Sequence, residues 1–109
     1  MPASLTPRTT ERPTLDELRT RFSDAGVESR AWSNAPGDRY DWHSHEQHKI
    51  LFCVEGAITF HTRDEDFLVE AGDRLDIEPG TSHAAHVHPE GVTCIEGFAS
   101  GPDALEPGY

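Results

Sequence analysis

The chain has 109 residues, enough for one domain with a single core and too few for two. Its 20 acidic and 9 basic residues give a formal net charge of -11, which repels phosphate backbones and anionic lipids and so disfavours nucleic-acid and membrane partners. The sequence has no apolar run of the roughly 18 residues that a membrane span needs, and its N-terminus lacks the pattern of a signal peptide. We therefore expect a cytoplasmic protein.

Residues 1–12 contain Pro and Thr without apolar periodicity, which predicts a flexible tail. Residues 13–26 predict a short helix packed on the rest of the domain. Thr14 is a suitable N-cap, and Glu17, three residues later, completes a capping box. Gly26 can end the helix in the left-handed conformation.

Residues 27–100 change to short β-rich runs separated by Gly, Pro and acidic turns. We expect strands at 27–33, 42–54, 57–63, 67–70, 74–77, 82–88 and 92–98. Short strands at this spacing indicate an all-β sandwich or barrel. Residues 101–109 predict a second flexible tail.

The two cysteines, Cys53 and Cys94, both lie inside apolar runs of this β-rich region. Such positions suit reduced, buried thiols better than the disulfide framework of a small secreted protein.

Two histidines, His43 and His45, alternate along the expected strand 42–54 and would project from the same face. His83, far along the chain after a Pro-Gly-Thr-Ser turn, is the natural third member of the group. Neutral imidazole is a common ligand of transition metals, and three imidazoles leave coordination positions open for water or substrate. This arrangement is typical of a catalytic metal site rather than a closed structural one.

Glycines frame these histidines at fixed spacings. The first group is Gly37, His43, His45, Lys49 and Gly56, and the second is Gly72, Glu78, Gly80 and His83. In order and spacing, the two groups resemble the two motifs of the cupin family. The resemblance covers about Gly37 to Phe98.

The resemblance implies a small antiparallel β-barrel of jelly-roll type that holds one divalent transition metal ion (Zn, Fe, Ni, Mn or Cu) in its mouth. The family's metal ligands correspond to His43, His45 and His83. Lys49 stands where the family usually has Glu or Gln as a fourth ligand, and a protonated amine has no lone pair for a metal.

Three interpretations of Lys49 remain open: an ion-pair partner of a neighbouring carboxylate, a cation that orients an anionic substrate, or a base with a lowered pKa. Its role as a catalytic residue depends on the second or third. His48 is a reserve ligand only, because neighbouring residues of a regular strand face opposite ways.

The other histidines have weaker claims as ligands. His86 and His88 have the opposite parity to His83, and His61 falls in a separate expected strand, so we expect solvated or interface side chains. The larger aromatic residues are expected to fill the core or a subunit interface. They are Trp42, Phe52, Phe60, Phe67 and Phe98.

Together these features predict a metal-binding cupin that acts on a small polar or anionic molecule, with a dioxygenase or an isomerase as candidate activities. The alternative is a non-catalytic module that binds a metal or small ligand, because one fold supports many functions. We also expect a homodimer, since a small barrel exposes edges or an apolar outer face. The outward-facing members of Ile50, Phe52 and Val54 are the candidates for that surface.

Overall fold

The computed structural model describes residues 3–8 and 12–105. The elements in chain order are β1 (Ala3–Thr6), α1 (Leu15–Asp24), β2 (Ser29–Asn34), β3 (Arg39–His43), β4 (His48–Thr62), β5 (Asp66–Glu70), β6 (Arg74–Ile77), β7 (His83–Ala99) and the 3-10 helix η1 (Pro102–Ala104). Within these ranges, neither helix has the length and apolar character of a membrane span.

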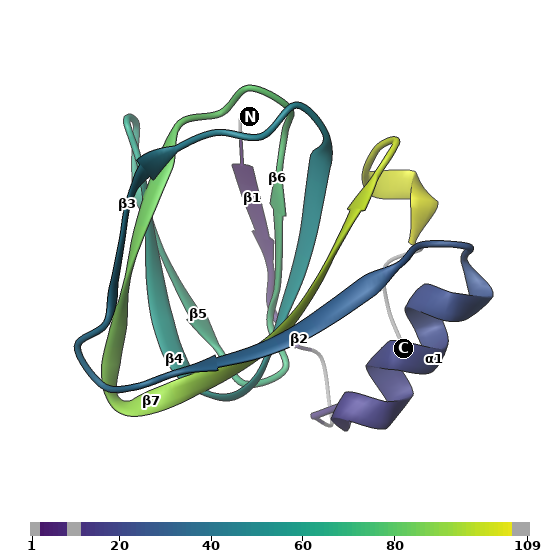
Figure 1. The fold of residues 1–109 in the computed structure, drawn as a ribbon, viewed down its shortest axis with the longest axis horizontal. Coiled ribbons are helices and arrows are strands. Elements are labelled where there is room, and N and C mark those ends of the chain that lie inside the picture. The colour runs from purple at the N-terminus through teal and green to yellow at the C-terminus, as the bar shows by residue number, and fades with distance from the viewer. Residues whose placement is uncertain (1–2, 9–11, 106–109) are drawn as a thin grey trace.

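Two long antiparallel strands, β4 and β7, pair with each other from one end of the molecule to the other. The first half of β4 also pairs with β6 and the second half with β5. In turn, β7 pairs with β3 through its first half and with β2 through its second, and β1 joins the edge of β6. The strands curve around a common interior (Figure 1), which confirms the expected jelly-roll barrel.

The sequence predicted a break at Glu55-Gly56, between the expected strands 42–54 and 57–63. Strand β4 instead continues, and its register against β7 shifts between Cys53 and Glu55 and again between Gly56 and Ile58. Gly56 has a φ of 75°, and a Cβ there would lie 1.9 Å from the carbonyl oxygen of Gly91. Only glycine allows the two long strands to approach this closely.

Side chains alternate between two apolar clusters along the long strands. Leu51 and Cys53 face the barrel interior, whereas Ile50 and Phe52 face outward under α1. Cys53 and Cys94 are cross-strand partners, and both are free and fully buried as predicted. The same alternation places Lys49 inside the barrel and His48 outside it.

Helix α1 matches its prediction. The Thr14 hydroxyl accepts a hydrogen bond from the Glu17 backbone N–H at 3.1 Å, and the Thr14 N–H donates to Oε1 of Glu17 at 2.8 Å. Leu18 and Phe22 are fully buried against the outer face of the barrel. Figure 1 shows the helix outside the barrel, beside the start of β2.

This packing overturns the surface proposed for a homodimer. Ile50 and Phe52 are buried beneath α1, and Val54 packs against the same cluster. The rings of Phe22 and Phe52 meet edge to face at 5.9 Å. The apolar outer face is therefore covered by the chain's own helix.

The tail expectations also need correction within the described residues. Ala3–Thr6 forms β1, which pairs with β6 and turns Ala3 and Leu5 toward the interior cluster. At the other end, the guanidinium of Arg74 donates to the carbonyl oxygens of Leu105 at 2.7 Å and Pro102 at 2.9 Å. The remaining tail residues (1–2, 9–11 and 106–109) lie outside the described ranges.

Candidate metal centre

The three predicted histidines come together from three different parts of the fold. His43 is the last residue of β3, His83 is the first residue of β7, and the two are register partners. His45 lies in the loop between β3 and β4, not on a continuous strand as predicted. The loop nevertheless brings all three together, with one ligand nitrogen from each within 4.8 Å of the others.

Backbone carbonyls fix which nitrogen of two of these rings carries the proton. Nδ1 of His43 lies 2.7 Å from the carbonyl oxygen of Asp41, and Nδ1 of His83 lies 2.9 Å from that of Thr81. A carbonyl only accepts, so each Nδ1 is the donor and the neutral ring keeps a bare lone pair on Nε2. Outer hydrogen bonds of this kind orient metal-binding histidines.

Two of the ring nitrogens are buried and have no hydrogen-bond partner among residues 3–8 and 12–105: Nε2 of His45 and Nε2 of His83. A buried polar atom without a partner is unfavourable unless something else binds it. Two such nitrogens beside His43 fit a bound metal ion. Three neutral imidazoles suit Zn, Fe, Ni or Cu in particular.

The electrostatics of the site favour the neutral forms of His45 and His83. Burial lowers the pKa of His83 to about 4. Burial, followed by the charge of Lys49, also lowers the pKa of His45. Because only the unprotonated ring binds a metal, both side chains are in the binding form at neutral pH.

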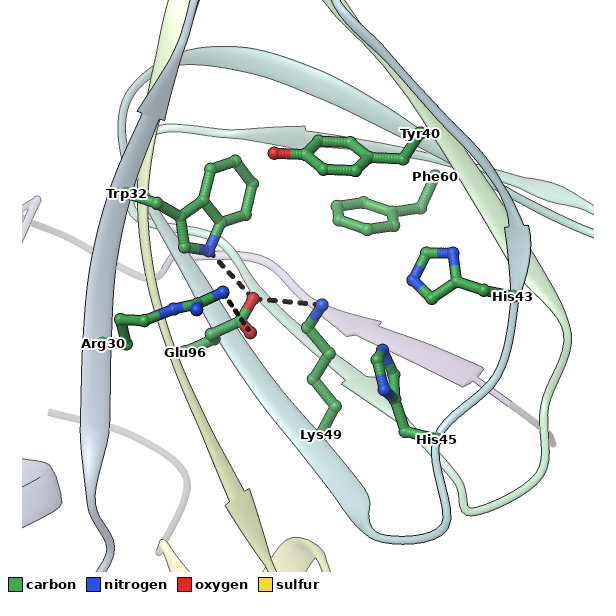
Figure 2. A pocket seen from close by; sticks show the side chains of 8 residues that line it. All are labelled: Arg30, Trp32, Tyr40, His43, His45, Lys49, Phe60 and Glu96. Carbon is green, nitrogen blue, oxygen red and sulfur yellow. Dashed lines mark hydrogen bonds and ion pairs between the residues drawn. The ribbon is translucent and has the colours of Figure 1, made fainter.

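Lys49 forms an ion pair inside the barrel, as the first interpretation expected. Its Nζ lies 3.0 Å from Oε1 of Glu96, and both side chains are less than a tenth exposed. The indole N–H of Trp32 donates to the same oxygen at 2.9 Å. Figure 2 shows the ammonium between Glu96 on one side and the histidines on the other.

His48, the reserve ligand, points away from this site. Its Nε2 lies 2.7 Å from Oδ1 of Asp76 on the outer face of the sheet. Asp76 also accepts two hydrogen bonds from Arg74, at 2.8 and 3.0 Å. His48 is therefore held in a buried polar network and is not part of the candidate metal centre.

A cavity of about 150 Å³ opens beside His43 and His45. Its lining residues are Arg30, Trp32, Tyr40, His43, His45, Lys49, Phe60 and Glu96. Trp32, Tyr40 and Phe60 form one side of it (Figure 2). The cavity thus combines an aromatic wall with charged groups and ring nitrogens.

Sequence reasoning missed Glu96 as a site residue. Its signal was a carboxylate in the apolar run 92–98, at a position of the same parity as Cys94.

Phe60 was predicted as core, and it both fills the interior and lines the cavity. Trp42 and Phe98 are 43% and 36% exposed and so are not core residues, which leaves the subunit interface as the remaining expectation for them.

Comparisons with known proteins agree with this fold. The family model of the AraC-like ligand binding domain matches residues 26–103. No curated protein sequence matches the chain.

Several solved structures share the fold. An RmlC-like cupin from Shewanella frigidimarina is 21% identical with a TM-score of 0.61, over 71% of this chain and 68% of the other. KdgF from Halomonas sp. is 19% identical with a TM-score of 0.61, over 93% and 79%. A chain from the structures of the DMSP lyases RdDddP and RnDddQII is 23% identical with a TM-score of 0.61, over 70% and 40%. Such low identities concern the fold alone, but the family model spans most of the chain, so the protein belongs to the AraC-like ligand binding domain family and is a small cupin domain.

Proposed function

We propose that the domain binds one divalent transition metal ion through His43, His45 and His83 and acts on a small polar or anionic molecule beside it. The observation that carries the proposal is the pair of buried, unpartnered ring nitrogens on His45 and His83. Three histidine ligands leave the full charge of the ion available and at least one coordination position open. The bound ion supplies Lewis-acid chemistry to an oxygen of the ligand.

The cavity supports a ligand that is small and has an anionic or polar group. Its volume of about 150 Å³ holds only a compact molecule. An ammonium has three donors, and the bond to Glu96 uses one, so Lys49 can donate to a ligand as well. The role of Lys49 is to bind and orient the anionic group of the ligand. The aromatic wall of Trp32, Tyr40 and Phe60 excludes water from the apolar part of the ligand.

The reaction classes that we propose are those of a dioxygenase or an isomerase. A non-catalytic ligand-binding module is the second candidate, and the match to a ligand-binding domain family favours it. The two candidates share one metal site and differ in turnover. Over a panel of thiols, diketones and catechols, oxygen uptake would indicate a dioxygenase and product formation without oxygen uptake an isomerase, whereas a binding module converts none of these compounds.

The metal site is tested by metal analysis of protein purified without added metal. His43→Ala and His83→Ala should each lose most of the ion bound at this site, because removing one of its three protein ligands weakens the binding. His48→Gln is the matched control, since His48 is also buried but points away from the site. Metal content that is the same in His43→Ala, His83→Ala and the parent would refute the assignment.

The role of Lys49 is tested by titrating small carboxylates into the metal-loaded protein. Lys49→Ala should keep the metal and weaken carboxylate binding by about 1.5–3 kcal/mol, the value of a hydrogen bond to a charged group. Lys49→Glu should tighten metal binding, because it adds a carboxylate ligand, and should repel the anion. Carboxylate affinity that is unchanged in Lys49→Ala would remove the ligand-binding role.

A further inference from the structure

A second group of histidines lies on the outer face of the barrel, away from the candidate metal centre. His61 projects outward from β4, and His86 and His88 project outward from β7. The register places His61 opposite Ala84 and Thr59 opposite His86, so the imidazoles of His61 and His86 are diagonal neighbours. Their opposite parity to the inward-facing Phe60 and Val87 puts them on the other side of the sheet.

Hydrogen bonds link a carboxylate and two of these rings in one line. Nδ1 of His61 lies 2.7 Å from Oδ1 of Asp66, and Nε2 of His61 lies 2.8 Å from Nδ1 of His86. The planes of the two rings are within 21° of each other. Two imidazole nitrogens therefore already point at a common position between them.

The Asp66 carboxylate determines which ring nitrogens of His61 and His86 carry a proton. Ionised Asp66 only accepts, so Nδ1 of His61 carries a proton and the neutral ring has its lone pair on Nε2. That lone pair accepts a hydrogen bond from the Nδ1–H of His86. A carboxylate behind a histidine whose far nitrogen is bare is the arrangement that orients and strengthens a metal-binding imidazole.

We propose that His61 and His86 form a second binding site for a divalent transition metal ion, of the class of Zn²⁺, Ni²⁺ or Cu²⁺, oriented by Asp66. With metal–nitrogen bonds of about 2.0–2.1 Å and a tetrahedral angle, the two nitrogens would lie about 3.3 Å apart. Opening the pair from 2.8 Å to that separation needs a side-chain shift of about half an ångström. The Nδ1 proton of His86 moves to its own Nε2, so two neutral rings bind the ion without net release of a proton.

The surroundings suit an open site that is weaker than the inner one. The His61 side chain is 29% exposed, which leaves room for water to complete the coordination. Partial burial, followed by the neighbouring His61 and His88, lowers the pKa of His86 and favours its neutral form. Arg39, the register partner of His86, adds a positive charge that opposes the ion. His88 is held by the hydroxyl of Thr59 at 2.6 Å and is not a ligand in this assignment.

The test is calorimetric titration of Zn²⁺ into His43→Ala/His83→Ala, in which the inner site keeps a single histidine. One binding event should remain, and adding either His61→Ala or His86→Ala should abolish it, whereas adding His88→Ala should retain it. Asp66→Asn should weaken this event by about 10–100-fold, the usual effect of removing an outer partner of a metal ligand.

The same substitutions in the parent background keep the test independent of whether His43→Ala/His83→Ala folds. There, His61→Ala and His86→Ala should each remove one equivalent of bound zinc and leave the inner site filled. Zinc stoichiometry unaffected by both substitutions would overturn the outer site, and loss of binding in His88→Ala would overturn the two-histidine assignment. Neither result would bear on the inner site, because its ligands are unchanged in these variants.

Discussion

Replacing Lys49 by methionine tests the buried ion pair at the centre of the site. Methionine keeps most of the length and apolar surface of lysine and removes only the charge. At 3.0 Å and an effective dielectric constant of about 20, the attraction between Lys49 and Glu96 is about 5 kcal/mol, from which the desolvation of both groups must be subtracted.

Lys49→Met leaves the Glu96 carboxylate buried, with the Trp32 N–H as its remaining close donor. The nearest nitrogen of Arg30 is 4.0 Å away, on a side chain that is 79% exposed, and compensates weakly. Breaking a buried pair from one side typically costs about 3–5 kcal/mol, so we expect a loss of that size in the free energy of unfolding. This is a large part of the roughly 5–15 kcal/mol of a whole domain.

The second variant removes both charges. In Lys49→Met/Glu96→Gln, the amide oxygen can still accept from Trp32, and no buried charge is left unpaired. We expect its unfolding free energy to return to within about 1–2 kcal/mol of the parent, since replacing both partners of a buried pair is often nearly neutral.

Urea unfolding of metal-free protein, evaluated by linear extrapolation, measures all three free energies. The matched control is Arg19→Met, which breaks the exposed pair of Arg19 and Asp16 at 3.7 Å and should change stability by less than about 0.5 kcal/mol. The reasoning is refuted if Lys49→Met loses no more than Arg19→Met, or if the double variant is as unstable as the single one.

Four further outcomes are expected. Below pH 6.5 the unfolded chain protonates His83 while the folded chain resists protonation down to about pH 4, so the stability of metal-free protein should fall as pH drops through this window, and His83→Gln should flatten the fall in pH-dependent urea titrations. Leu18→Ala should cost about 2–5 kcal/mol in urea unfolding because it empties a fully buried position under α1, and a cost below 1 would contradict that packing. Gly56→Ala should lower the melting temperature far more than Gly37→Ala, since both have positive φ but only Gly56 lies against the backbone of Gly91; equal effects would dismiss the close approach. Because α1 covers the surface first proposed, the expected homodimer would have to bury exposed apolar side chains such as Trp42, Leu68 and Phe98; light scattering at tens of micromolar, roughly the range of a moderate interface, should give a dimer mass, and a monomer would count against the homodimer.

Local patterns were sufficient for several features of this protein. The capping box of Thr14 and Glu17 predicted the start of α1, because both residues lie within one helical turn. Parity along a strand predicted that His48 and Lys49 project from opposite faces of the sheet. It also predicted that His86 projects from the face opposite to that of His83. The glycine-framed histidines predicted the barrel through their resemblance to the two cupin motifs, and with it the grouping of His43, His45 and His83.

Other features depend on which distant segments pair. Residues 3–6 form β1 along the edge of β6, and their apolar alternation is only Ala3 and Leu5, which is too short to predict a strand without knowing its partner. The surface formed by Ile50 and Phe52 is covered because α1 packs on it, which strand parity could not indicate.

Sequence alone thus determined the elements whose residues interact across a few positions of the chain: the cap of α1, the alternating faces of the strands, and the glycine positions. Only the tertiary structure decided that Lys49 pairs with Glu96 and that His61 meets His86. These partners are 47 and 25 positions apart, and a shift of one residue in the β4–β7 register would move each to the other face of the sheet. That register is set by the summed packing of two long strands and their bulges, so no single segment of the sequence carries it.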